Sequence, residues 1–324
     1  MKAVLVDNFW NFDPEREKMM FAKEDIDFFV ANVSNDEDYI EKCKDADAVL
    51  IGMRKTPAQV IEQLKSCKVM VRYGIGYDVI DVDACNKMEI AVCNIPDYCI
   101  EEVAAHTAAL ALDCLRQISY RNDMVHDGKW IGEAHGYSVK RLSGLTYGLC
   151  GFGNIARKTA EYMRGFGFKL IGYDPYIAEK VFKENNVQKV TLEELCQTAD
   201  IISVHVPLNK DTFHLISKPR FDIMKKGMVI INTSRGGLVC QEDLLNAVDE
   251  GIVKAAGLDV LETEPLTNLN ERILKYKNIV LTPHFAFNSQ ESFDELRKKV
   301  VESAISVLKG QMPYNVVNKK DLIK

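Results

Sequence analysis

The chain has 324 residues, of which 47% are hydrophobic and 27% charged, with a formal net charge of −6 and a pI of about 5.7. This length suits two domains better than a single core. No block of lysine and arginine stands out, which argues against nucleic acid as a partner, and no apolar run is long enough to span a membrane.

The N-terminus and the cysteines both indicate a cytoplasmic protein. The first residues, MKAVLVDNFW, are too polar for a signal peptide. Nine cysteines are scattered without a C-x-x-C pair, which favours neither a disulfide framework nor a metal site. We therefore expect a reducing compartment and no bound metal.

Short β-branched runs alternate with segments of helical period along most of the chain. Most strand candidates are continuous apolar runs, which is typical of strands covered on both faces. This alternation predicts an α/β protein with doubly wound parallel sheets. The expected strands are residues 2–7, 46–52, 68–74, 90–96, 146–151, 168–174, 200–207, 227–234, 254–260 and 278–284.

Several helices carry recognisable start signals. Thr56 precedes a proline at the first expected helical position, and residues 191–194 (TLEE) have the form of a capping box. An alanine- and leucine-rich stretch predicts one long helix over residues 100–125. Asn288 or Ser289 is expected to cap the last amphipathic helix.

The strongest local motif is a glycine-rich turn between a strand and a helix. Gly151-x-Gly153-x-x-Ala156 follows an apolar strand, and small residues let the backbone approach a pyrophosphate at the helix N-terminus. The next strand ends in Asp174, where an acid would accept hydrogen bonds from both ribose hydroxyls. Because a carboxylate would repel a 2′-phosphate, the motif predicts NAD rather than NADP as cofactor.

Three polar residues follow the ends of three later strands. Arg235 comes after one strand, Glu264 lies beyond the next, and His284 ends the last. In an open parallel sheet these ends share one edge, where ligands bind. We therefore expect the three side chains to converge, although none would be singled out alone.

The motifs RYGIGYDVIDVDAC (72–85), NIPDYCIEEVAAHTAALAL (94–112), GFGNIAR (151–157), HVPLNKDTFHLI (205–216), NTSRGGLV (232–239), LDVLETEP (258–265) and TPHFAF (282–287) occur in this order. In them the chain resembles the D-isomer-specific 2-hydroxyacid dehydrogenases. The resemblance implies a Rossmann NAD-binding domain, residues 100–288, inserted into a flavodoxin-like substrate domain, residues 1–99 plus 289–324. It also implies a homodimer, formed through an arm over residues 126–144 and the long helix beside it.

The resemblance also assigns roles for the reduction of a small 2-keto acid to a 2-hydroxy acid. His284 would donate the proton, and the Glu264 carboxylate would favour its imidazolium form. Arg235 would pair with the substrate carboxylate and polarise the carbonyl. The backbone N–H groups of Ile75 and Gly76 would also bind the carboxylate.

The expected cofactor contacts lie on the loops that follow the strands of the second domain. Asp259 would steady either the nicotinamide carboxamide or Arg235, and the sequence does not choose between the two. The cofactor-binding set is Gly151, Gly153, Asn154, Ile155, Asp174, Val206, Pro207, Thr212, Thr233, Ser234 and Asp259.

The other five histidines are expected to be structural. His205 would form part of the cleft wall, and His106 would be a packed, hydrogen-bonded core residue. His126, His135 and His214 have no partners that the sequence reveals.

Two further readings stay open beside a D-2-hydroxyacid dehydrogenase. One is another NAD enzyme on this scaffold, a formate or phosphite dehydrogenase, although formate dehydrogenases of this family carry glutamine where Glu264 stands. The other is an NAD(H)-sensing regulatory protein that resembles the C-terminal-binding corepressors. Since those proteins keep the same three residues, the triad does not separate them from enzymes.

Overall fold

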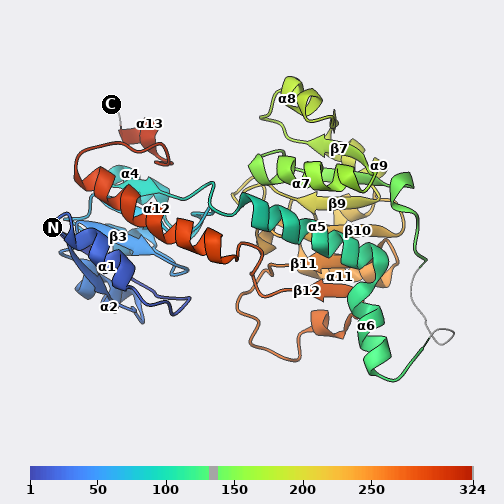
Figure 1. The fold of residues 1–324 in the computed structure, drawn as a ribbon, viewed down its shortest axis with the longest axis horizontal. Helices are drawn as coiled ribbons and strands as arrows, with labels where there is room; N and C mark the ends of the chain where they lie inside the picture. Colours follow the sequence, from blue (N-terminus) through green and yellow to red (C-terminus); the bar gives the residue numbers. More distant parts are fainter. Residues whose placement is uncertain (131–137, 323–324) are drawn as a thin grey trace. The chain divides into compact units, whose positions relative to one another are not determined.

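The structure is a computed structural model that describes residues 1–130 and 138–322, and the chain divides into two compact units. Unit 1 consists of Met1–Tyr98 together with Ser289–Lys324, and unit 2 consists of Cys99–Asn288. The division after residue 98 is one position from the expected boundary. Each unit contains one sheet flanked by helices (Figure 1).

The unit 1 sheet has five parallel strands in the order β2-β1-β3-β4-β5, which is the flavodoxin-like order. Every residue of β3 and β4 is buried, because helices cover both faces. Helices α2, α3 and α4 pack on one face, and α1 and α12 lie together on the other. The strands are β1 Lys2–Leu5, β2 Asp27–Val30, β3 Ala48–Ile51, β4 Val69–Arg72 and β5 Ala91–Cys93; the helices are α1 Glu15–Ala22, α2 Asp36–Cys43, α3 Ala58–Ile61, α4 Val82–Lys87, α12 Gln290–Leu308 and α13 Lys319–Leu322.

Residues from opposite ends of the chain complete unit 1. Arg297 on α12 donates through Nε and Nη2 to the two carboxylate oxygens of Glu17 on α1, at 2.7 and 2.6 Å. Glu17 is fully buried, so this bidentate pair satisfies a charge that water cannot reach. The side-chain oxygen of Asn318 accepts a hydrogen bond from the N–H of Val92 in β5, at 2.9 Å. The sheet of unit 1 is therefore finished by the last part of the chain.

The unit 2 sheet has seven parallel strands in the order β12-β11-β10-β9-β6-β7-β8. The strand order reverses between β6 and β9, which is the switch point where a Rossmann fold binds its ligand. Helices α5 and α7 pack on one face of this sheet, and α9 and α11 pack on the other. The strands are β6 Thr146–Cys150, β7 Lys169–Tyr173, β8 Gln188–Lys189, β9 Ile201–Val204, β10 Met228–Asn232, β11 Val253–Leu258 and β12 Ile279–Leu281.

The helices of unit 2 are α5 Ile100–Arg116, α6 Ile118–His126, α7 Asn154–Gly165, α8 Glu179–Glu184, α9 Leu192–Thr198, α10 Lys218–Phe221 and α11 Gln241–Asp249, with 3₁₀ turns η1 Leu142–Gly144, η2 Gly236–Leu238 and η3 Arg272–Lys275. The predicted α/β fold with two doubly wound parallel sheets is confirmed. None of the helices in the described ranges combines the length and apolar character needed to cross a bilayer.

Two local predictions are wrong. The helix expected over residues 100–125 is two helices, because Gln117 adopts a left-handed conformation (φ +59°) and Asp113 accepts a hydrogen bond from the Ser119 N–H at 2.8 Å. Thr56 caps no helix: its hydroxyl bonds the Tyr39 hydroxyl at 3.1 Å, and Pro57 precedes α3.

Other local predictions are confirmed or were absent. The capping box at residues 191–194 forms, and Ser289 caps α12. The short edge strands β2 and β8 were not predicted: β8 is only the polar pair Gln188-Lys189, and β2 is a four-residue strand of alternating burial whose apolar run was overlooked. Residues 131–137 lie outside the described residues. They include His135 and the middle of the expected dimer arm, residues 126–144.

Candidate active site

The glycine-rich turn connects β6 to α7 at the switch point of the unit 2 sheet. Gly151 has φ +97°, and a Cβ there would lie 2.9 Å from the backbone N of Val206, so only glycine fits. A Cβ on Gly153 would meet nothing within 4 Å. The first glycine therefore serves close packing, and the second leaves an open approach to the first N–H groups of α7, at Asn154 and Ile155.

Asp174 lies directly after β7 and is tied to this turn. Its Oδ2 accepts a hydrogen bond from the Phe152 N–H at 2.9 Å, and its Oδ1 accepts from the Tyr176 N–H at 2.9 Å. These bonds fix the carboxylate beside the glycine-rich turn, where the ribose of a dinucleotide would lie. The residues present thus fit NAD: an approachable helix N-terminus and an acid in place next to it.

The remaining expected cofactor contacts lie on loops whose conformation is held by short hydrogen bonds. The Thr212 hydroxyl donates to the Pro207 carbonyl at 2.6 Å, which closes the loop that begins at Val206. The Thr233 and Thr107 hydroxyls lie 2.8 Å apart, and the Ser234 hydroxyl donates to the carbonyl of Val204 at the end of β9. These loops leave the carboxyl ends of β9 and β10, the same edge as the glycine-rich turn.

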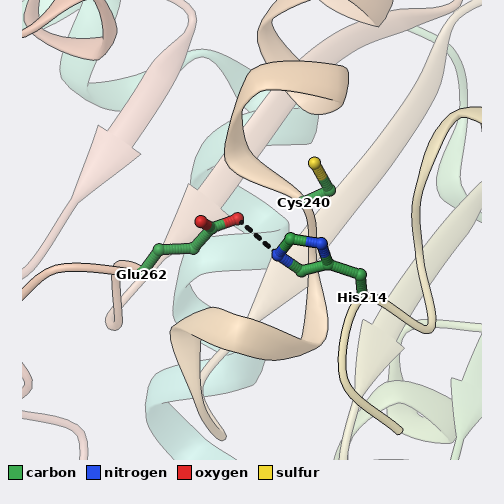
Figure 2. A group of neighbouring side chains, drawn as sticks. All are labelled: His214, Cys240 and Glu262. Atoms are coloured by element: carbon green, nitrogen blue, oxygen red, sulfur yellow. Dashed lines mark ion pairs between the residues drawn. The ribbon is translucent and has the colours of Figure 1, made fainter.

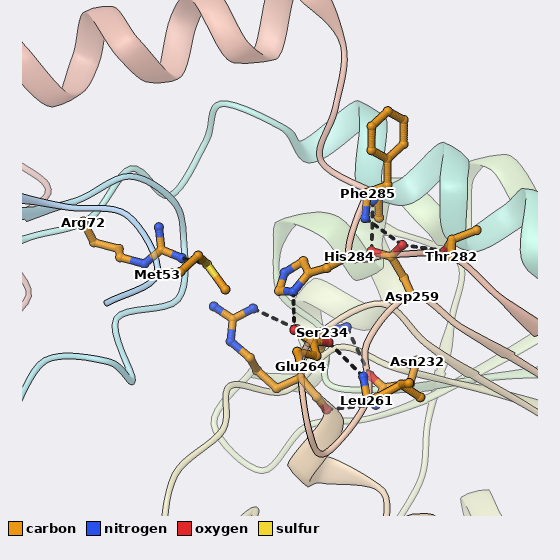
Figure 3. Close-up of polar contacts among 12 residues, drawn as sticks. Met53, Arg72, Asn232, Ser234, Asp259, Leu261, Glu264, Thr282, His284 and Phe285 are labelled. Carbon is orange, nitrogen blue, oxygen red and sulfur yellow. Dashed lines mark hydrogen bonds and ion pairs between the residues drawn. The ribbon is translucent and has the colours of Figure 1, made fainter. Parts of the chain in front are cut away.

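His284 and Glu264 are brought together as the sequence predicts. His284 Nδ1 lies 2.8 Å from Glu264 Oε2, while Glu264 Oε1 accepts from the Leu261 N–H at 2.8 Å (Figure 3). Burial raises the pKa of Glu264, but the hydrogen bond and charge of His284, the Leu261 N–H and the charge of Arg235 outweigh it, so the pKa is lowered overall. Glu264 is therefore a carboxylate across the neutral range.

The backbone of His284 adopts a conformation that is rare for any residue but glycine. Its φ is +53°, in the left-handed region. Its N–H donates to the Asp259 carbonyl at 2.7 Å. Non-glycine residues in this region store strain, and they cluster at functional sites. The strain is maintained by the hydrogen bonds around it.

Asp259 is the buried centre of that hydrogen-bond network. With only 1% of its surface exposed, its carboxylate accepts from the N–H groups of Phe285 and Ala286, both at 2.9 Å, and from the Thr282 hydroxyl at 2.5 Å (Figure 3). His106 Nε2 lies 2.9 Å from the Thr282 hydroxyl and 3.5 Å from Asp259. Asp259 thus holds the turn around His284, a role that the sequence did not suggest.

Arg235 lies in a loop that touches the one leading to Glu264. Its Nη1 donates to the Ser234 carbonyl at 2.8 Å, and its own carbonyl accepts from Asn232 Nδ2 at 2.8 Å. A Cβ on the next residue, Gly236, would lie 1.9 Å from the Leu261 carbonyl oxygen. The absence of that Cβ lets the two loops pack in direct contact, which places the guanidinium near enough to act on the pKa of Glu264.

The other described histidines differ from one another. His205 is half-buried beside the Ser203 hydroxyl at 2.8 Å, and desolvation lowers its pKa to about 3, so it is neutral near pH 7. His106 is half-buried in the network beneath His284. The sequence indicates no partners for His214, but in the structure Cys240 and Glu262 lie beside it.

The expected substrate-binding turn belongs to unit 1. Ile75 and Gly76 follow β4 and are half-buried, and the Ile75 carbonyl accepts from Asn94 Nδ2 at 2.7 Å. Arg72, at the end of the same strand, is 4% exposed, and its Nη2 lies 3.2 Å from Met53 Sδ (Figure 3).

Comparison with known proteins identifies the family. The family model described as D-isomer specific 2-hydroxyacid dehydrogenase, NAD binding domain, matches residues 108–286. A glyoxylate reductase of Korarchaeum cryptofilum is 36% identical over 288 residues, 87% of this chain and 85% of that protein. A hydroxypyruvate reductase of Blautia hydrogenotrophica is 34% identical over 287 residues, 87% of this chain and 88% of that protein.

Among solved structures, a glyoxylate reductase from Paecilomyes thermophila is similar, with a TM-score of 0.90 and 26% identity, covering 98% of this chain and 99% of that one. The resemblance drawn from the sequence motifs is thereby confirmed. This chain belongs to the D-isomer-specific 2-hydroxyacid dehydrogenases, a family of NAD-dependent oxidoreductases that act on the CH–OH group of 2-hydroxy acids.

Proposed function

We propose that the protein catalyses reversible hydride transfer between NADH and the C2 carbonyl of a small 2-keto acid, with His284 as proton donor. The observation that carries the proposal is the pair of His284 Nδ1 and Glu264 Oε2, 2.8 Å apart, on a backbone held in the left-handed region. Residues 108–286 match the family's NAD-binding domain.

Each group of the triad has a distinct part in the proposed chemistry. Bound NADH supplies the hydride to C2 of the substrate. Because Nδ1 of His284 is engaged by Glu264, the proton for the carbonyl oxygen leaves from Nε2, and the carboxylate stabilises the imidazolium beforehand. Arg235 pairs with the substrate carboxylate and polarises its carbonyl. In the reverse direction, neutral His284 takes the hydroxyl proton.

Other residues are proposed to bind substrate and cofactor. The N–H groups of Ile75 and Gly76 bind the substrate carboxylate in unit 1, the substrate domain. Asp174 binds the ribose hydroxyls and selects NAD over NADP. We further propose that the enzyme is a cytoplasmic homodimer. The cofactor is held by Gly151, Gly153, Asn154, Ile155, Asp174, Val206, Pro207, Thr212, Thr233, Ser234 and Asp259.

The relatives narrow the substrate class. Two of them are named for glyoxylate and hydroxypyruvate, both short 2-oxo acids. NADH oxidation should therefore be measured with pyruvate, hydroxypyruvate, glyoxylate, 3-phosphohydroxypyruvate, and branched and aromatic 2-oxo acids. We expect turnover with the small acids. Negligible rates with all of them, together with tight NADH binding, would instead favour the NAD(H)-sensing regulatory protein.

The His284→Ala variant tests the proton donor. General acid catalysis contributes ~10²–10⁴-fold, so kcat should fall by this factor while the Kd of NADH, measured by fluorescence, changes less than about twofold. Phe166→Ala is the control, because Phe166 is an exposed ring that follows α7 and belongs to neither the proposed site nor the proposed dimer arm. A His284→Ala enzyme with near wild-type kcat would remove the histidine from the mechanism.

A further inference from the structure

A second group of chemically reactive side chains lies in unit 2, apart from the triad. His214, Cys240 and Glu262 come from three separate segments: a loop after β9, the residue before α11 and the loop after β11 (Figure 2). One donor atom from each lies within 4.8 Å of the other two. The proposed dehydrogenase chemistry uses none of the three.

The backbone holds these donors in place. The His214 N–H donates to the Gly237 carbonyl at 2.8 Å, and its φ of +51° lies in the left-handed region. The Gln241 N–H donates to Glu262 Oε1 at 2.6 Å, which ties the third segment to the start of α11. The three segments are therefore held next to one another, although they share no helix or strand.

The Nε2 atom of His214 pairs with the Glu262 carboxylate but has no hydrogen bond. It is shielded from solvent and lies 3.1 Å from Glu262 Oε1 (Figure 2). A buried polar atom of this kind ordinarily has a partner. A cation between the nitrogen, the carboxylate and the Cys240 sulfur would supply one.

The donor set selects the class of cation. One imidazole nitrogen, one thiolate and one carboxylate are ligands that Zn²⁺ takes, whereas Mg²⁺ and Ca²⁺ prefer oxygen alone. A thiolate and a carboxylate carry two negative charges, which balance a divalent ion. With bonds of about 2.0–2.3 Å, the ligand atoms of a tetrahedral site lie about 3.3–3.8 Å apart. The donor atoms here lie within 4.8 Å of one another, so they need to move by only about 1 Å.

We propose that His214, Cys240 and Glu262 form a Zn²⁺ site with its fourth position open to water. The site connects two loops of the proposed active site. Cys240 lies five residues after Arg235, and Glu262 lies two residues before Glu264. Zinc bound there stabilises the folded enzyme to the extent that it binds the native arrangement more tightly than the unfolded chain.

Cobalt provides a direct test, because Co²⁺ bound to a thiolate gives an intense near-ultraviolet charge-transfer band. Eight of the nine cysteines are buried and Cys240 is half-buried, so the band reports this thiol. We expect one equivalent of Co²⁺ to give the band and one of Zn²⁺ to abolish it. Zinc should also raise the thermal midpoint. At a free Zn²⁺ concentration of 100 times Kd, the added free energy of unfolding is about 2.7 kcal/mol.

Variants separate this site from other binding. Cys240→Ser should lose the band, and His214→Gln and Glu262→Gln should each weaken Zn²⁺ binding by at least about tenfold. Cys196→Ala, which removes a buried thiol in the same unit, and His126→Gln, which removes an exposed imidazole, should leave binding unchanged. Failure of the band to form, or equal Zn²⁺ affinity in Cys240→Ser and wild type, would overturn the proposal while leaving the dehydrogenase function untouched.

Discussion

Asp259→Asn is expected to loosen the turn that carries His284. The carboxylate accepts the Ala286 N–H at Oδ2, and it accepts the Phe285 N–H and Thr282 hydroxyl at Oδ1. An asparagine offers one acceptor oxygen and one NH₂ donor. If its oxygen keeps the Oδ1 position, its NH₂ opposes the Ala286 N–H, and the flipped rotamer opposes the other backbone N–H instead.

The magnitude follows from that geometry. At least one buried N–H is left without a partner, which costs about 1–3 kcal/mol, and the remaining bonds lose the strengthening that a charged acceptor gives. We therefore expect a loss of about 2–4 kcal/mol. At about 2–4 °C per kcal/mol for a unit of this size, the thermal midpoint should fall by roughly 4–16 °C. Because His284 lies in the affected turn, kcat should fall as well.

Thermal unfolding by circular dichroism and steady-state NADH oxidation should be measured on the same preparations. Asp222→Asn is the matched control, since Asp222 is an exposed carboxyl of the same unit and lies outside the proposed cofactor loops. If Asp259 served only the cofactor, Asp259→Asn would raise the KM for NADH with an unchanged midpoint. That outcome would refute its role in holding the turn.

Three further predictions follow from the cofactor loop and the triad. Gly151→Ala should destabilise the protein by about 1–3 kcal/mol and weaken NADH binding at least tenfold, whereas Gly128→Ala, at a positive φ with nothing within 4 Å of the added Cβ, should leave NADH binding intact. Asp174→Ser should reduce the preference for NADH over NADPH in kcat/KM by at least tenfold; a wild-type enzyme that used both equally would contradict this. The pKa of Glu264 is lower in the folded than in the unfolded protein, where it is about 4.3. The ionised carboxylate therefore stabilises the fold at pH values above about 4.3, and this stabilisation is lost as the pH falls through the pKa of the folded state. The stability of wild type over Glu264→Gln, from urea unfolding, should therefore be larger at pH 7 than at pH 3.5, and an equal gap at both pH values would contradict the assignment.

The sheets and the contact between His284 and Glu264 could be predicted because their signals lie in short stretches of sequence. Apolar runs marked most strands, and the topology of a parallel sheet brings the residues after successive strands to one edge. His284 and Glu264 are 20 residues apart, yet the strand ends alone indicated that they would meet. The Gly151 turn was recognisable because close backbone approach calls for small residues at fixed spacing, and Asp174 because an acid ends the strand that follows.

What the sequence could not show depends on side-chain partners from separate segments. The His214 cluster joins residues from three loops, and no spacing rule connects them. Asp259 follows β11 as any loop acid would, and only the folded turn reveals that it accepts from Phe285 and Ala286. The break at Gln117 could not be predicted, because glutamine is itself a good helix former and the left-handed conformation of one residue leaves no compositional trace.

The discontinuity of unit 1 has a consequence for biosynthesis. Val92 and Asn318 hydrogen-bond although they are 226 positions apart, and Glu17 reaches its arginine partner only on α12. Residues 1–98 hold all five strands of their own sheet but emerge from the ribosome long before α12, which packs on that sheet, whereas residues 99–288 hold all of unit 2. The segment translated first should thus be the one that matures last, and until α12 is synthesised it exposes the apolar sheet face on which that helix packs.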